Sequence, residues 1–412
     1  MSKITTADLE EAPLATLQRL TTDPDQPLHQ GPYTSPLRDE RLAAILGAAL
    51  GILFTICFIT GLYSHLHQHP LSWLPVPSRP AGLFRFTQGL HVASGIASLP
   101  VLLAKLWVVW PRFVSFPPVR RLTDLVERIG LFPLVAGGIF MVFSGIANIA
   151  QWYPWHFGFP AAHYWMAWVT MGAIGAHLGA KWLIARRALA RPSRRPALAE
   201  PDPILGTVAE EVRDGLSRRG LLTTVAASAG ALTLLTIGQT FRPLRRLALL
   251  APRDPQVGPS GRPVNRSAAN AGVLRSASSR DYRLQVTGNV TRAQSLDLAQ
   301  LQAMAVHEAV LPIACVEGWS YSARWKGVRL RDLLDLAGAP PGATAHVVSL
   351  EANSPYRVSY LDRDQAHDPD TLLATHLDGA PLVPDHGAPL RLIGPGRPGV
   401  TQTKWVTMVV VG

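Results

Sequence analysis

The sequence predicts two folds in one chain: an all-α transmembrane bundle of four helices plus a fifth anchoring helix, and after it an α+β domain. Three observations predict this. Four long apolar stretches stand in the first half of the chain, and each is long enough to cross a hydrocarbon core of about 30 Å as a helix. A basic pair and a fifth apolar stretch follow them. From residue 280 on, apolar and polar residues alternate between turns rich in Gly and Pro, which is typical of strands.

Composition places the chain at a membrane and not on nucleic acid. Hydrophobic residues make up 48% of the 412 residues, and the formal net charge is +11. Such a charge suits nucleic acid when the basic residues share one soluble face, but here they stand in short clusters beside apolar runs. We therefore expect a lipid bilayer as a partner and no nucleic acid. Two cysteines, Cys57 and Cys315, are too few for a disulfide framework.

The predicted membrane domain occupies residues 42–187. Glycines in its third span let neighbouring helices approach closely. The polar residues 1–41 before it, rich in Pro, Thr and acidic groups, are typical of a disordered tail and not of a secretory signal. The four apolar spans are residues 42–63, 84–110, 129–152 and 161–183.

Basic residues in the loops give this bundle an orientation. They are concentrated between the second and third spans and after the fourth, whereas the loop 152–162 has no Lys or Arg. By the positive-inside rule, the N-terminus and the 184–216 loop are cytoplasmic. We expect a multi-pass protein of the bacterial cell (inner) membrane. Its tail 1–41 and a Pro-rich linker, 188–216, lie in the cytoplasm, and its C-terminal domain is extracytoplasmic.

Residues 217–239 combine the pair Arg218-Arg219 with a weakly apolar run. This combination resembles a twin-arginine (Tat) export signal placed inside the chain. The pair also suits an ordinary positive flank of a fifth membrane helix. The two interpretations are compatible, because one helix can be both signal and anchor. Residues 240–259 then form a connector, with a short interfacial helix predicted at 241–250.

Several sequence blocks mark the C-terminal domain, residues 260–412. Cys315 stands in the run Leu-Pro-Ile-Ala-Cys-Val-Glu-Gly-Trp-Ser, and Trp325-Lys326-Gly327 follows it. Near the end stand Asp385-His386-Gly387-Ala388-Pro389-Leu390-Arg391, Gly394-Pro395-Gly396-Arg397-Pro398-Gly399 and Lys404-Trp405. In this order and at these separations, the blocks resemble the molybdopterin-binding domain of the sulfite oxidase family. The resemblance is greatest to the bacterial branch that includes the catalytic subunit of periplasmic methionine-sulfoxide reductase.

The resemblance implies a molybdenum cofactor, with Cys315 as the ligand of the metal and Glu317 as an acidic residue beside it. By residue type alone, a thiolate suits a soft or high-valent metal, while a lone cysteine is more often a small buried hydrophobe. For Glu317 the alternative is a structural hydrogen bond to the backbone. By position, Tyr356 and Arg357 border the substrate pocket. Candidates for pterin contacts, each with a surface or turn role as its alternative, are Asn265, Arg266, His386, Arg391, Arg397 and Lys404.

Histidines within the apolar spans predict haem. His91 lies in the second span, and His163 and His177 lie in the fourth. Positions fourteen apart return to nearly the same helix face, so His163 and His177 face one bundle interior. Depth along the helices pairs His91 with His163 near the outer surface and leaves His177 without an obvious partner. The arrangement resembles the b-type cytochrome subunits of bacterial formate dehydrogenases and hydrogenases, which implies haem b; hydrogen bonds between helices are the alternative.

These expectations combine into one electron path. The quinone/quinol pool exchanges electrons with the membrane domain, haem carries them outward, and molybdenum transfers an oxygen atom. The run Cys-Val-Glu-Gly-Trp favours the reductase branch, so we expect a molybdopterin-dependent oxidoreductase that reduces an S- or N-oxide, including methionine-sulfoxide-type substrates. The Tat export machinery is the partner that carries the folded domain outward. The alternatives are a sulfite-type dehydrogenase that delivers electrons to quinone, and a non-catalytic membrane electron-transfer or anchor protein.

Overall fold

The computed structural model describes residues 35, 37–71, 73–74, 76–113, 122–190, 217–237, 242–251, 253–254 and 256–412. Most of the predicted tail 1–41 and linker 188–216 lies outside these residues. The chain divides into two compact units. The first consists of Met1–Thr55, Ser94–Ile146 and Trp155–Leu232, and the second of Ile56–Ala93, Ala147–Pro154 and Thr233–Gly412.

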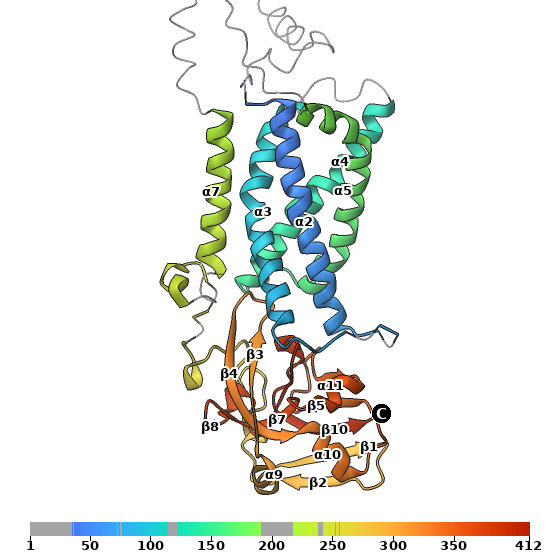
Figure 1. Cartoon of the computed structure of the whole chain (residues 1–412), viewed down its shortest axis with the longest axis vertical. Helices are drawn as coiled ribbons and strands as arrows, with labels where there is room; N and C mark the ends of the chain where they lie inside the picture. Colours follow the sequence, from blue (N-terminus) through green and yellow to red (C-terminus); the bar gives the residue numbers. More distant parts are fainter. Residues whose placement is uncertain are drawn as a thin grey trace, which may run out of the picture. The chain divides into compact units, whose positions relative to one another are not determined.

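Helices form at all five predicted apolar stretches (Figure 1). Four of them, α2, α3, α4 and α7, are long and apolar enough to cross a membrane. The helix at the predicted fourth span, α5, is not in this set, because residues such as His163, His177 and Lys181 lower its hydropathy. The helices are α2 (Glu40–Gln68), α3 (Leu83–Phe113), α4 (Leu122–Ile149), α5 (Phe159–Ala190) and α7 (Arg218–Ile237).

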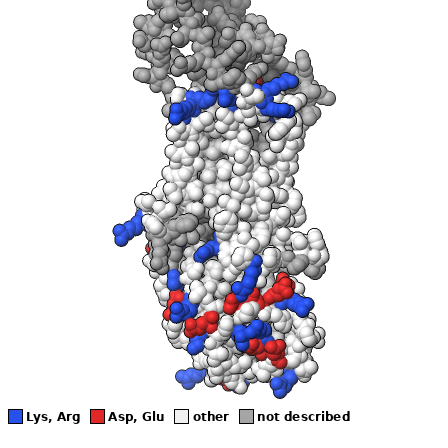
Figure 2. All heavy atoms as spheres, in the orientation of Figure 1, with Lys and Arg blue, Asp and Glu red and all other residues white. Residues whose placement is uncertain are grey.

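Small and apolar residues hold the helices of the first unit together. A Cβ at Gly137 of α4 would stand 2.5 Å from Thr170 Oγ1 of α5, so a larger residue there would displace Thr170. Arg218, at the start of α7, forms an ion pair with Asp39, next to the start of α2. Lys and Arg gather at one end of the helices, and a band of the visible face along the helices carries no charged side chains (Figure 2). The cluster that joins α7 to α2 and α3 contains Leu42, Leu46, Val101, Val108 and Val225.

The C-terminal part of the second unit is an α+β domain, as predicted. One sheet has the strand order β2-β1-β10-β5-β6, and the other has the order β3-β4-β7-β8 with β9 paired to β7. Only the β1–β10 pairing is parallel among the described strands. The strands are β1 (Arg283–Gly288), β2 (Gln294–Asp297), β3 (His307–Ala314), β4 (Ser320–Arg329), β5 (Ala345–Ser349), β6 (Val358–Leu361), β7 (Leu372–Leu377), β8 (Ala380–Pro381), β9 (Arg391–Ile393) and β10 (Val406–Val411).

Short helices complete the domain and the connector before it. The predicted interfacial helix at 241–250 is a 3₁₀ helix, η3 (Arg242–Leu247), shorter than expected. The other 3₁₀ helices are η4 (Pro259–Gly261), η5 (Pro384–His386) and η6 (Gly399–Thr401). The α-helices are α8 (Leu274–Ala277), α9 (Leu298–Met304), α10 (Leu330–Ala337) and α11 (Arg363–His367).

Helix α10 shows how the sequence pattern builds the core. Leu330, Leu333, Leu334 and Ala337 recur at helical spacing and are all fully buried in the cluster against the first sheet. Gly338 ends the helix in the left-handed conformation, at φ 65°, which glycine adopts without a Cβ clash. A separate cluster on the second sheet contains Cys315 and its aromatic neighbours. Cys315 is therefore part of a packed core.

We predict that Leu334→Ala lowers the free energy of unfolding of the C-terminal domain by about 3 kcal/mol, because it leaves a cavity in a fully buried site. Guanidinium unfolding of the detergent-purified protein, followed by tryptophan fluorescence, measures this change. The control is Val306→Ala, whose side chain is 79% exposed and whose loss changes stability by less than about 0.5 kcal/mol. Equal effects of the two variants would contradict this assignment of the core.

Candidate functional site

Cys315 lies in the tight turn that joins β3 to β4. Its backbone N–H donates to Trp319 O at 2.9 Å, and the Gly318 N–H donates to Cys315 O at 3.1 Å. Gly318 has φ +89°, and a Cβ there would stand 3.3 Å from Val92 Cγ1 of α3. The turn therefore requires glycine at this position. It holds the Cys315 side chain, which is 3% exposed, in one place.

The surroundings of the thiol disfavour its charged form. Burial raises the pKa of Cys315 well above its ordinary value, and the neighbouring Glu317 carboxylate raises it further. The Glu317 backbone N–H, Arg253 and Lys404 lower this pKa, but by less. A thiolate at this position therefore needs a strongly positive partner within bonding distance, which is what a metal ion supplies.

Glu317 is held by three side-chain donors. Its Oε1 accepts from Gln151 Nε2 at 2.5 Å, and its Oε2 accepts from Trp319 Nε1 at 2.7 Å and from Arg253 Nε at 3.3 Å. Arg253 Nη2 also donates to Gln151 Oε1 at 2.9 Å. The structural alternative for Glu317 was a hydrogen bond to the backbone. The contacts that hold its carboxylate are instead with side chains.

Three basic side chains of the late sequence blocks form a group near Cys315. Arg391, 4% exposed, donates through Nη1 to His386 O at 3.1 Å and lies over the Trp325 ring. Lys404 Nζ donates to Arg266 O and to Asp385 O, each at 2.8 Å. Burial lowers the pKa of Arg391 and of Lys404, while the charge of a Cys315 thiolate raises both. A Cys315 thiolate therefore interacts electrostatically with both cations.

Two buried polar atoms of this group lack a hydrogen-bond partner among the described residues. They are Nε of Arg391 and Nδ1 of His386, whose Nε2 bonds to Pro259 O at 2.7 Å. Buried polar atoms are rarely left without a partner, so these two point to a polar group that binds here. An anionic pterin that also carries N–H groups fits them, because Arg391 Nε donates as guanidinium groups do to phosphate, whereas Nδ1 of the neutral His386 accepts, since its Nε2 donates to Pro259 O. The residues present thus fit the molybdenum cofactor that the sequence predicts.

Gly387 keeps this group compact. It follows η5 in the left-handed conformation, at φ +107°, and a Cβ there would stand 3.1 Å from Lys404 Cβ and 3.2 Å from Arg391 Cβ. Any larger side chain would separate the two cations. The position after His386 therefore requires glycine.

The remaining candidates lie in different settings. Arg266 is paired with Glu351 at 2.5 Å, and Asn265 is exposed beside it. Arg397 is buried, and its guanidinium bonds to Tyr360 O, Gln365 Oε1 and Thr401 O, so all three of its nitrogens serve the protein. These contacts match a structural role in a turn, which was the alternative to a pterin contact for Arg397.

Tyr356 lies near the site, as its position in the sequence suggested, whereas Arg357 is exposed. The Tyr356 hydroxyl donates to Gln68 Oε1 at 3.3 Å. Burial raises the pKa of Tyr356, and so does the charge of a Cys315 thiolate. Tyr153 is affected in the same way by burial, Glu317 and Cys315. A Cys315 thiolate thus interacts electrostatically with both phenols, as it does with that of Tyr321.

The three candidate haem histidines of the helices belong to different units. His91, in the second unit, places Nδ1 2.9 Å from Cys57 O and 3.2 Å from Thr60 Oγ1. His163, in the first unit, places Nδ1 2.8 Å from Ser144 Oγ. His177 lies on α5 and is half-buried. Metal-bound histidines commonly use one ring nitrogen in this way and bind the metal through the other.

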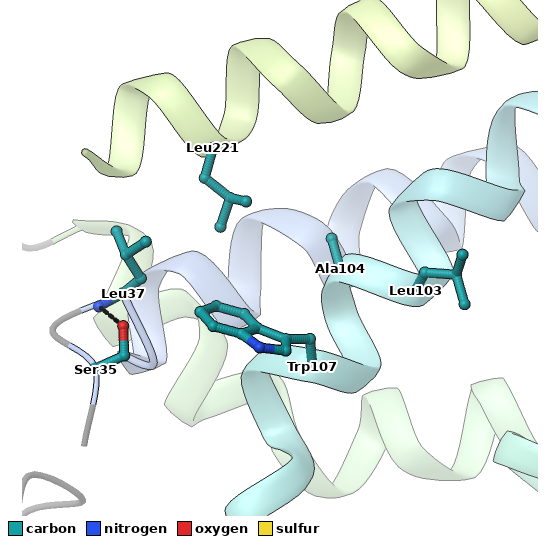
Figure 3. Close-up of a pocket in the computed structure, with 6 residues that line it drawn as sticks. All are labelled: Ser35, Leu37, Leu103, Ala104, Trp107 and Leu221. Carbon is teal, nitrogen blue, oxygen red and sulfur yellow. Dashed lines mark hydrogen bonds between the residues drawn. The ribbon is translucent and has the colours of Figure 1, made fainter. Parts of the chain in front are cut away.

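A groove of about 450 Å³ lies in the first unit between α3, α7 and the chain before α2 (Figure 3). Leu221 of α7 points toward Leu37 and the Trp107 ring, and Ser35 Oγ accepts from Leu37 N at 3.3 Å. The groove is apolar and offers no acid, base or nucleophile among the residues that line it. Those residues are Ser35, Leu37, Leu103, Ala104, Trp107 and Leu221.

Sequence reasoning missed Gln151 and Arg253, which contact Glu317 from 166 and 64 positions away. No local pattern marks either residue, so only the fold reveals them. Asp385 was also missed as a functional residue. Its carboxylate accepts the Ala268 N–H at 2.8 Å, its backbone O accepts from Lys404 Nζ, and its place directly before His386 was a usable signal.

The comparisons with known proteins agree with this site. Residues 271–412 match the family described as the oxidoreductase molybdopterin binding domain. The C-terminal part of the chain is thus similar to the molybdopterin-binding domains of sulfite oxidases and methionine-sulfoxide reductases. This match to an oxidoreductase domain agrees with the molybdenum cofactor that the residues of the site fit.

Individual relatives match about a third of the chain. The mitochondrial sulfite oxidase of Drosophila melanogaster is 33% identical over 157 residues, which are 32% of this chain and 27% of that protein. The protein-methionine-sulfoxide reductase catalytic subunits MsrP of Xanthomonas campestris and Gluconobacter oxydans are each 33% identical, over 31% of this chain and 44% and 46% of their own. The chain therefore spans less than half the length of these curated relatives.

We predict that acid destabilises the fold through His386. Burial lowers the pKa of His386 to about 4, whereas the unfolded chain protonates a histidine near pH 6.5. Between about pH 6.5 and pH 4 the unfolded state binds the extra proton, so stability falls with pH by up to about 3 kcal/mol. His386→Gln keeps a donor for Pro259 O and removes this dependence. Guanidinium midpoints from pH 7 to pH 4 measure it, and parallel curves for wild type and variant would contradict the assignment.

Proposed function

We propose that the chain is a membrane-anchored molybdenum oxidoreductase that takes electrons from quinol through haem b and reduces an S- or N-oxide outside the cell membrane. One observation supports it most: the buried Cys315 interacts electrostatically with the cations Arg391 and Lys404, and Arg391 Nε and the adjoining His386 Nδ1 are buried without a partner among the described residues. This is the donor set that a molybdenum–pterin group requires. The relatives that are methionine-sulfoxide reductase subunits support an oxide of the methionine-sulfoxide type as substrate.

Each residue has a defined part in this proposal. When bound, the cofactor supplies two-electron oxygen-atom transfer. Cys315 holds the metal through its thiolate. Arg391, Lys404 and His386 bind the anionic pterin and fix its orientation, and the phenols of Tyr153 and Tyr356 border the place where the oxide binds. The reaction balances as oxide plus two electrons plus two protons giving the reduced product plus water, with both electrons supplied by oxidation of one quinol.

The helices supply the membrane and haem parts of the proposal. Four of them are apolar enough to cross a bilayer, and Lys and Arg gather at one end, which the positive-inside rule assigns to the cytoplasm. Arg218-Arg219 at the start of α7 suits Tat export of the folded domain. Nδ1 of His91 and Nδ1 of His163 each contact a polar group of a neighbouring helix. A histidine that binds haem iron through one ring nitrogen commonly makes such a contact with the other.

The runner-up function runs the same path in reverse: a sulfite-type dehydrogenase that delivers electrons to quinone. The similarity to a sulfite oxidase favours it. Rapid haem reduction on adding sulfite to the oxidised protein would support this direction, and haem reoxidation by a sulfoxide would support ours. The non-catalytic anchor loses its support, because residues 271–412 match an oxidoreductase domain.

We predict that Cys315→Ser reduces sulfoxide turnover to about one hundredth or less, because a serine hydroxyl is not a thiolate ligand. Turnover is measured with reduced viologen as the donor, which reaches the molybdenum site without passing through haem. The matched control is the other cysteine, and Cys57→Ser retains viologen-driven turnover. Full activity of Cys315→Ser would exclude the proposed metal ligand.

We predict that His91→Ala abolishes most of the low-spin b-type haem spectrum and lowers quinol-driven turnover about tenfold or more, because iron loses an axial ligand. Viologen-driven turnover stays unchanged, which separates loss of haem from loss of the molybdenum site. The control is His69→Ala, which removes an exposed histidine of the second unit. An unchanged haem spectrum in His91→Ala would contradict the haem part of the proposal.

A further inference from the structure

Glu317 is bound to two residues that lie outside the molybdopterin-binding region 271–412. Gln151 and Arg253 form a closed ring with it, in which Gln151 donates to one carboxylate oxygen, Arg253 to the other, and Arg253 to the Gln151 side chain. The Trp319 indole N–H completes the set of donors. Glu317 is 8% exposed, so water does not compete with these contacts over most of its surface. The carboxylate two residues from Cys315 is therefore fixed by other parts of the second unit.

The backbone at Gln151 adopts a conformation that a side chain disfavours. The Trp152 N–H donates to Ala147 O and the Gln151 N–H to Asn148 O, which together form a Schellman motif at the end of α4. Gln151 occupies the left-handed position of this motif, at φ 53°, where glycine is the usual residue. Its side chain is the one that reaches Glu317. A strained non-glycine residue whose side chain contacts a functional group indicates a functional constraint.

Arg253 provides the charge that this carboxylate needs. Its guanidinium is the one cation paired with Glu317 among the described residues, and it also orients the Gln151 amide so that the nitrogen faces Glu317. The next residues after Gln151 lie against the same site, since the charges of Glu317 and Cys315 act on the Tyr153 phenol. Two separate segments thus converge on one carboxylate.

We propose that Gln151 and Arg253 are positioning residues that hold the Glu317 carboxylate in one orientation beside Cys315 during turnover. The proposal rests on the proposed molybdenum reductase function and deepens it. The segment that follows α4 and the connector that precedes the C-terminal domain complete the catalytic site, so the region 271–412 does not contain the whole site. Neither residue touches the metal or the substrate, and both act through Glu317.

Gln151→Gly gives the sharpest test, because it separates structure from function at a single position. Glycine removes the side chain and relieves the left-handed backbone, so a merely structural role predicts an equal or higher Tm and unchanged turnover. The positioning role predicts an equal or higher Tm, full molybdenum content and a kcat about tenfold lower with little change in KM. The full chain, purified in detergent, is assayed with reduced viologen and a methionine-sulfoxide substrate.

Four further variants complete the design, namely two at Arg253, the double variant and a matched control. Arg253→Gln lowers kcat to a similar extent, and Arg253→Lys restores part of it. The double variant is no worse than either single variant, because both residues act through Glu317. The matched control is Arg85→Gln, which breaks the 2.9 Å bond of Arg85 to Ser322 in the same unit without touching Glu317 and keeps turnover within about twofold of wild type.

Electron paramagnetic resonance of the molybdenum(V) state gives a readout besides turnover. The positioning role predicts altered g values in Gln151→Gly and in Arg253→Gln, and wild-type values in Arg85→Gln. Wild-type spectra and kcat in both Glu317-partner variants, in protein that contains molybdenum and turns over, would overturn the inference and leave the proposed function intact. Wild-type protein without molybdenum or turnover would overturn the proposed function itself.

Discussion

The constraint on which the rest of the site depends is the burial of a thiol beside a carboxylate. Cys315 and Glu317 bring two potential negative charges into a turn that is almost closed to water. Burial disfavours both charges, so each requires a partner. Glu317 has Arg253, Gln151 and Trp319. For Cys315, Arg253 and Lys404 lower the pKa of the thiol but do not outweigh the effect of burial. The metal that we propose as the partner of Cys315 supplies this positive charge at the sulfur.

The fold delivers these partners from distant parts of the sequence. The hairpin of β3 and β4 sets Cys315, while η5, Gly387 and the segment before β10 bring His386, Arg391 and Lys404 to it. Gly387 allows the cations to approach, and Trp325 covers Arg391. Buried polar atoms without a partner are costly in a closed core, so Arg391 Nε and His386 Nδ1, together with the charges of Arg391 and Lys404, support the proposal that an anionic ligand binds there.

Much of this was predictable from the sequence, for physical reasons. Apolar runs that are long enough to cross a bilayer predict helices. Stretches in which apolar and polar residues alternate, bounded by turns rich in Gly and Pro, predict strands. The blocks around Cys315 and His386 identified the domain. The sequence could not show that the Arg397 guanidinium bonds to backbone oxygens and to Gln365, since turn and ligand roles use the same residue type. It also could not show Gln151 or Arg253, because a contact across 166 positions leaves no local pattern. Polar residues on α5 lowered its hydropathy below that of the other spans.

The measurement that tests the central claim most directly is elemental analysis with a visible spectrum on the detergent-purified full chain, made in a host that synthesises the pterin cofactor. The account predicts about one molybdenum atom per chain, together with a dithionite-reducible b-type haem spectrum. If the protein contained molybdenum but no haem, the helices would serve as an anchor, and a separate electron donor would be required. A chain that contains no molybdenum under these conditions would contradict the account.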